Sequence, residues 1–100
     1  MELHNFLRSL TDKIYKVLPM YESGDSGVFT YIERFIAELK GGMYTFPVLQ
    51  SEGQYISVIN NLNYILHCQC SVEECRRQTF DSISLVKKII KNLEEYNGEP

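Results

Sequence analysis

The side chains best able to do chemistry gather in one short stretch, at His67, Cys68, Cys70 and Cys75. Imidazole and thiolate groups bind zinc, and a structural zinc site takes about four of them in a tetrahedral array. The paired Cys-x-x-Cys knuckles of a zinc module are absent, and free cysteines are commonly buried. We therefore interpret the cysteines as reduced packing residues and expect no metal and no cofactor. A metal site built from these four residues is the less favoured alternative.

The same residues make a poor catalytic set. A thiol nucleophile needs a base within hydrogen-bond reach. Adjacent residues of a helix point about 100° apart, so His67 is badly placed to activate Cys68. The sequence contains no G-x-S-x-G, P-loop, G-x-G-x-x-G or H-E-x-x-H motif. We expect a protein that is not an enzyme and has no catalytic residues.

Charge is unevenly distributed along these 100 residues, whose net charge is −3. Acids outnumber bases over residues 1–75, and bases outnumber acids over residues 76–91. The bases of the second region are Arg76, Arg77, Lys87, Lys88 and Lys91. No aromatic residue is expected to interleave with them, so a solvated helix face is the favoured interpretation and no nucleic-acid partner is expected. No apolar run approaches the roughly 18 residues that span a bilayer, and no signal peptide is recognisable. We expect no membrane partner and a cytoplasmic location.

The elements that must position these residues are helices. Apolar residues recur at spacings of three and four in segments of approximately 2–18, 26–44, 52–67 and 72–96. Short connections between such segments favour antiparallel neighbours. The sequence therefore predicts an all-α fold, an antiparallel up-down-up-down four-helix bundle, with residues 1–100 forming a single helical domain.

Helix ends are predicted from breaker and capping residues. Pro19 and Pro47 are expected to stop the first two helices, and Asp25 or Ser26 is expected to cap the second. Capping boxes are predicted at Ser51–Gln54 and Ser71–Glu74. The pair Gly41–Gly42 interrupts the second helix, so either the helix frays there or something approaches its backbone closely.

Tyrosines, acids and small residues lie away from the apolar stripes of the second and third helices and in the loop before the second. A tyrosine-rich, acidic and partly apolar surface is typical of protein–protein contacts. The predicted partner-binding residues are Tyr21, Glu22, Asp25, Tyr31, Glu33, Ala37, Gly41, Tyr44, Ile56, Asn60, Asn63 and Tyr64.

With its four capped helices, its net charge of −3 and the stretch Tyr21-Glu22…Asp25…Tyr31…Glu33, the chain resembles a class of bacterial immunity proteins. These are small acidic helical proteins that bacteria make against secreted nuclease toxins, such as those of contact-dependent growth inhibition. The resemblance implies a protein-binding module that blocks a basic toxin domain. The alternative is a self-associating structural or regulatory bundle, with a homodimer seam at Ala37, Gly41, Ile56 and Tyr64.

Overall fold

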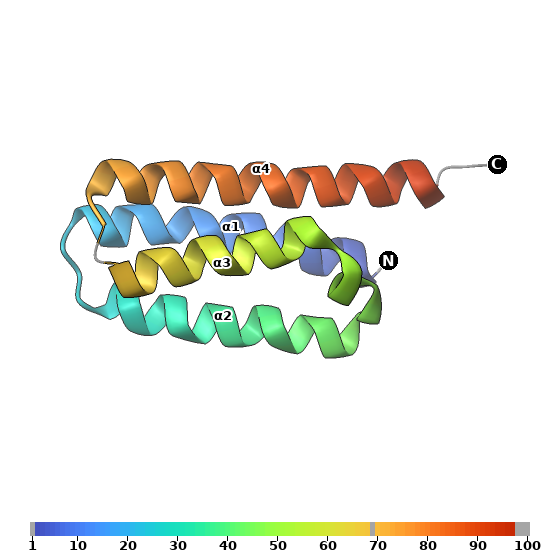
Figure 1. Cartoon of the computed structure of the whole chain (residues 1–100), viewed down its shortest axis with the longest axis horizontal. Coiled ribbons are helices and arrows are strands. Elements are labelled where there is room, and N and C mark those ends of the chain that lie inside the picture. Colours follow the sequence, from blue (N-terminus) through green and yellow to red (C-terminus); the bar gives the residue numbers. More distant parts are fainter. Residues whose placement is uncertain (1, 69, 98–100) are drawn as a thin grey trace.

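The structure, a computed structural model, describes residues 2–68 and 70–97, with side chains up to Glu94. Within this part of the chain it contains four α-helices and one short 3₁₀ helix. They are α1 (Glu2–Glu22), α2 (Gly27–Thr45), η1 (Pro47–Ser51), α3 (Gly53–Cys68) and α4 (Val72–Asn97). Each α-helix runs back along the one before it (Figure 1). The predicted all-α, antiparallel up-down-up-down four-helix bundle is therefore confirmed.

The core is formed by one buried stripe from each helix, as the spacing of apolar residues predicts. Its largest fully buried side chains include Leu7, Leu10 and Ile14 of α1, Ile32 and Leu39 of α2, Tyr55, Leu62 and Ile65 of α3, and Ile89 of α4. Full burial of one such side chain stabilises the fold by about 1.5–3 kcal/mol. α4 packs closely on both α1 and α3, whereas α2 makes less extensive contact with its two neighbours. The bundle is thus tightest around α4 and more open beside α2.

The prediction that Pro19 ends the first helix is wrong. α1 continues through Pro19 and ends one turn later at Glu22. Proline has no backbone N–H, so the carbonyl of Tyr15 lacks its usual partner four residues on. The Tyr15 side chain is half exposed, so this turn of the helix faces solvent and water can bond to the carbonyl instead. The helix tolerates the proline because the lost hydrogen bond is not a buried one.

A glycine provides the actual stop signal for α1. Gly24 has a φ of 73°, in the left-handed region that favours glycine. Its amide donates to the carbonyl of Tyr21 at 3.2 Å, and the amide of Asp25 donates to the carbonyl of Met20 at 3.0 Å. These two bonds form a Schellman motif, which satisfies carbonyls at the end of the helix.

Of the two alternatives for the cap of α2, Asp25 is the residue that makes a bond. Its carboxylate accepts a hydrogen bond from the amide of Gly27 at 2.8 Å. Ser26 immediately precedes the helix, but its side chain makes no capping bond. α2 therefore begins one residue later than predicted, with a carboxylate at the positive end of the helix dipole.

One predicted capping box is present and the other is not. The Ser71 hydroxyl accepts from the amide of Glu74 at 3.2 Å, and Glu74 accepts from the amide of Ser71 at 3.1 Å. This is the predicted reciprocal box at the start of α4. The box predicted at Ser51 is wrong, because η1 holds this residue and its hydroxyl donates to the carbonyl of Val48. The 3₁₀ helix that begins at Pro47 was not predicted from the sequence.

The Gly41–Gly42 pair does not break α2, since the helix continues through both residues. A Cβ atom on Gly42 would lie 2.6 Å from Cζ of Phe6 and 2.8 Å from Oη of Tyr55. Tyr55 is fully buried and donates to the carbonyl of Leu39 at 2.5 Å. The second alternative, close approach to the backbone, is therefore correct for Gly42, and the approaching groups belong to α1 and α3. A Cβ atom on Gly41 would meet nothing within 4 Å.

The two glycines should respond oppositely to alanine. We expect Gly42→Ala to lower the free energy of unfolding by about 1–2 kcal/mol, because overpacking outweighs the gain in helix propensity. The matched control Gly41→Ala should raise it by up to about 1 kcal/mol, since alanine favours a helix and the site is open. Urea unfolding followed by circular dichroism measures both. Equal effects of the two substitutions would contradict the packing role of Gly42.

Candidate functional site

A surface groove runs between α2 and α3. Its larger hollow, of about 530 Å³, is lined by Lys40, Met43, Tyr44, Gln50, Ile56 and Ile59. A smaller hollow, of about 280 Å³, is lined by Glu33, Ile36, Ala37, Lys40, Asn63, Leu66 and His67. Lys40 borders both hollows, so they adjoin, and together they are called the α2–α3 groove below.

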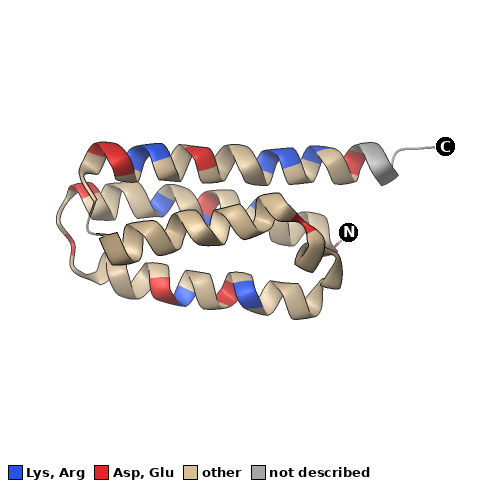
Figure 2. Cartoon of the chain, viewed as in Figure 1, with Lys and Arg blue, Asp and Glu red and all other residues tan. Residues whose placement is uncertain are grey.

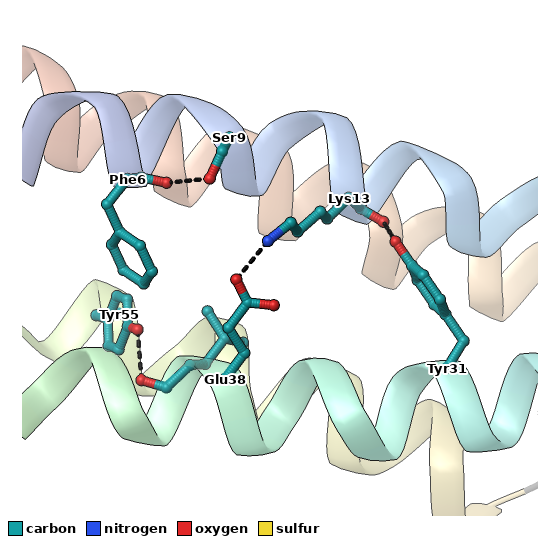
Figure 3. A network of polar contacts seen from close by, with 7 residues as sticks. Phe6, Ser9, Lys13, Tyr31, Glu38 and Tyr55 are labelled. Carbon is teal, nitrogen blue, oxygen red and sulfur yellow. Dashed lines mark hydrogen bonds and ion pairs between the residues drawn. The ribbon is translucent and has the colours of Figure 1, made fainter.

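Polar contacts fix α2, which forms one wall of this groove, to α1 and α3 (Figure 3). The Tyr31 hydroxyl donates to the carbonyl of Lys13 at 2.8 Å, and the Lys13 ammonium forms an ion pair with Glu38. On the other side of α2, Tyr55 donates to the carbonyl of Leu39. Burial raises the pKa of both tyrosines, so their hydroxyls stay protonated and donate throughout the neutral range. α2 is thus tied to both α1 and α3.

The groove is apolar and poor in charge. Ile59 is buried, Met43 and Ile56 are half-buried, and 84% of the Tyr44 side chain is exposed at the rim. α3 has no Asp, Glu, Lys or Arg from its first residue to its last, as Figure 2 shows, whereas α2 carries charges in its middle turns and α4 carries them along its length. The centres of protein–protein interfaces are likewise depleted in charge and enriched in aromatic residues. The groove therefore has the composition of a protein-binding surface.

Nine of the twelve predicted partner-binding residues lie on α2 and α3, but one of them, Tyr31, is directed toward α1 rather than the groove. Glu33, Ala37, Tyr44, Ile56 and Asn63 line the groove itself. Gly41, Asn60 and Tyr64 lie exposed on the same two helices without lining either hollow. The structure thus brings these residues to the α2–α3 side of the bundle, although only five of them share one site.

Tyr31 and the three predicted residues outside α2 and α3 hold the fold together. The Tyr21 hydroxyl donates to the carbonyl of Cys70, and Tyr31 donates to the carbonyl of Lys13. Burial and the bond to Cys70 raise the pKa of Tyr21 to about 12. Glu22 forms an ion pair with Arg76 at 2.7 Å, and Asp25 caps α2. The polar atoms of these four side chains form hydrogen bonds or an ion pair within the chain. They do not form one acidic patch on the surface.

Several groove residues were missed by the sequence reasoning. These are Ile36, Lys40, Met43, Gln50, Ile59, Leu66 and His67. Met43 and Ile59 belong to the predicted core stripes, and only the spacing of α2 and α3 leaves part of them uncovered. Gln50 reaches the groove because η1 follows α2, and η1 was not expected. One signal could have found the site, namely the absence of charge from residues 53–68.

The His67–Cys75 cluster does not assemble. The Cys75 thiol is fully buried against the Thr79 hydroxyl, and burial raises its pKa to about 11, so it is protonated at neutral pH. Cys70 is buried beside the hydroxyl of Tyr21, whereas Cys68 and His67 are exposed. No three His, Cys, Asp or Glu side chains in the described ranges lie close enough together to hold a metal ion.

The basic side of α4 differs from expectation in one respect. Phe80 is 47% exposed and meets the half-exposed ring of Tyr15 edge-on, with ring centroids 6.4 Å apart. An aromatic residue therefore does lie on the helix face between Arg76 and Lys87. Arg76 is already paired with Glu22, so part of this basic charge is compensated within the chain.

Comparison with known proteins adds no family to this description. The chain matches no family model, no curated protein and no solved structure. In the part of the chain that the structure describes, none of the helices is both long enough and apolar enough to cross a membrane.

Tyr64 connects the edge of the α2–α3 side to the start of α4. Its hydroxyl donates to the carboxylate of Glu74 at 3.0 Å, and the same carboxylate accepts from the amide of Ser71. These hydrogen bonds, first the one from Ser71 and then the one from Tyr64, hold the pKa of Glu74 below its usual 4.5. The charged form of Glu74 is therefore favoured in the folded chain.

Stability should fall in acid because of this carboxylate. A lowered pKa in the folded state contributes stability above the unfolded pKa of 4.5, and that contribution disappears as pH falls through the folded value. We expect Glu74→Gln to lose less stability than the wild type between about pH 5 and pH 3. The matched control is Glu73→Gln, one residue earlier, whose carboxylate accepts no hydrogen bond from the described residues. Urea unfolding at a series of pH values measures the difference, and identical acid dependence of Glu74→Gln and the wild type would exclude the role assigned to Glu74.

Proposed function

We propose that this protein is a non-enzymatic protein-binding module whose contact surface is the α2–α3 groove. The observation that carries the proposal is an apolar hollow with an exposed tyrosine at its rim, next to a helix without charge. Tyr44 and Ile56 are the residues best suited to dominate such a contact, because aromatic and apolar groups at the centre of an interface contribute most binding energy. Lys40 and Glu33 would set the orientation of the partner.

The partner that we propose is a basic protein, and specifically a nuclease-type toxin domain that this chain blocks as an immunity protein. A net charge of −3 supports a basic partner, because opposite net charges speed diffusional encounter. The apolar hollow would then slow dissociation once the surfaces have met. Blocking requires only that the bound chain cover the toxin's substrate site, so no catalytic group is needed here.

Co-purification with the tagged chain from its own cell tests this proposal. The expected result is a basic protein that degrades nucleic acid and loses that activity when the chain is added in equal amount. An open reading frame next to the gene that encodes such a domain would give the same protein for direct assay. A partner that is acidic, or whose activity the chain does not inhibit, would exclude the immunity function.

Truncation within the groove should weaken this complex. We expect Tyr44→Ala and Ile56→Ala each to raise the Kd at least about tenfold, because each removes apolar contact at the centre of the interface. The matched control is Tyr15→Ala, which removes a half-exposed tyrosine from α1, on the other side of the bundle. Isothermal titration of the three variants measures the effect. If Tyr15→Ala weakened binding and the groove variants did not, the contact surface would lie on α1 and α4.

Reversing the charge of a rim residue distinguishes a side chain that steers the approaching partner from one that contacts it in the complex. Glu33→Lys should lower the association rate constant more than it raises the dissociation rate constant, because an exposed acid at the rim mainly steers a basic partner. Glu22 and Asp25 are unsuitable for this test, since their reversal would break an ion pair and a helix cap. Surface plasmon resonance at two salt concentrations measures both rate constants. An association rate that rises on reversal would indicate an acidic partner.

A further inference from the structure

Two opposite charges border the smaller hollow of the α2–α3 groove. Glu33 and Lys40 are both exposed and lie seven residues apart on α2, about 10 Å along the helix axis. Neither forms an ion pair with another described residue, whereas Glu38, on the same helix, is paired with Lys13. The groove therefore presents an uncompensated carboxylate and an uncompensated ammonium at a fixed spacing.

This spacing is self-complementary. Ala37 lies midway between the two charges and also lines the hollow. A two-fold axis that crosses α2 at Ala37 places Glu33 of one copy opposite Lys40 of a second copy. It also places Lys40 of the first copy opposite Glu33 of the second, so the same ion pair forms twice. The single methyl group of Ala37 at the axis lets the two α2 helices approach each other closely.

The same axis sets the outer face of α3 against α3 of the second copy. Because α3 carries no acidic or basic residue other than His67, no like charges are forced together along most of its length. Asn60 and Asn63 have both donors and acceptors and can bond to each other across the axis. The net charge of −3 on each copy opposes association at long range, but physiological salt screens it beyond about 8 Å.

We propose that a second copy of this chain covers the α2–α3 groove, held by two symmetry-related Glu33–Lys40 ion pairs and by contact between the uncharged faces of α3. The homodimer goes beyond the proposed function, because it needs no other partner. It also occupies the surface assigned to that partner, so the dimer has to dissociate before the partner binds.

Sedimentation velocity of the purified chain tests the proposal. The wild type should show dimer increasing between about 10 µM and about 500 µM, the range expected for a weak interface. Glu33→Lys and Lys40→Glu should each weaken self-association at least about tenfold, because each replaces two attractive pairs with two repulsive ones. An equimolar mixture of these two variants should form heterodimers, and the double variant E33K/K40E should dimerise like the wild type.

Matched controls reverse charges away from the groove, with Asp12→Lys on α1 and Lys88→Glu on α4, and both should dimerise like the wild type. Circular dichroism checks that every variant is folded. A wild type that stays monomeric throughout overturns the proposal and leaves the groove to a different protein. Dimers that persist in Glu33→Lys, or a mixture that does not associate, overturn it as well. A monomeric result would not contradict the proposed inhibition of a toxin, because inhibition is assayed separately with the basic partner.

Discussion

The arrangement of α2 depends on the missing side chain of Gly42. The rings of Phe6 and Tyr55 reach the α2 backbone there, in space that a Cβ atom would occupy. This close approach lets the buried Tyr55 hydroxyl donate to the carbonyl of Leu39, so a polar group in the core is satisfied. The α2–α3 groove lies along the same two helices, beside the point where Tyr55 ties α3 to α2.

Tyrosines connect the helices of this bundle. Tyr21, Tyr31 and Tyr55 each donate to a backbone carbonyl outside their own helix, and Tyr64 donates to a carboxylate at the start of α4. Such residues supply apolar area and one directional bond, which suits the seams of a small bundle. Tyr44 differs, because it lies exposed beside the groove and its hydroxyl donates no such hydrogen bond to another described residue. Tyr44 is therefore the tyrosine that the groove offers to a partner, whereas the tyrosines above serve the fold.

The distribution of charge complements this division. Compensated pairs such as Arg76–Glu22 and Lys13–Glu38 lie between α4 and α1 or between α1 and α2. The α2–α3 side keeps one acid and one base unpaired next to a helix without charge. Covering the α3 part of this surface would therefore cost little desolvation of charge, whereas Glu33 and Lys40 would need partners of opposite charge.

The sequence by itself determined the fold class, the four α-helices and most of their limits, because apolar spacing, the box at Ser71 and the cap at Asp25 act through neighbours within four residues. It misjudged Pro19 and Ser51, where exposure and a 3₁₀ helix override the local rule. Only the tertiary structure decided which acids and tyrosines are free. Tyr21 meets Cys70 and Glu22 meets Arg76 across 49 and 54 residues, and no local pattern encodes such contacts. The site was therefore only partly predictable, since a groove is defined by the spacing of two helices rather than by the residues of either one.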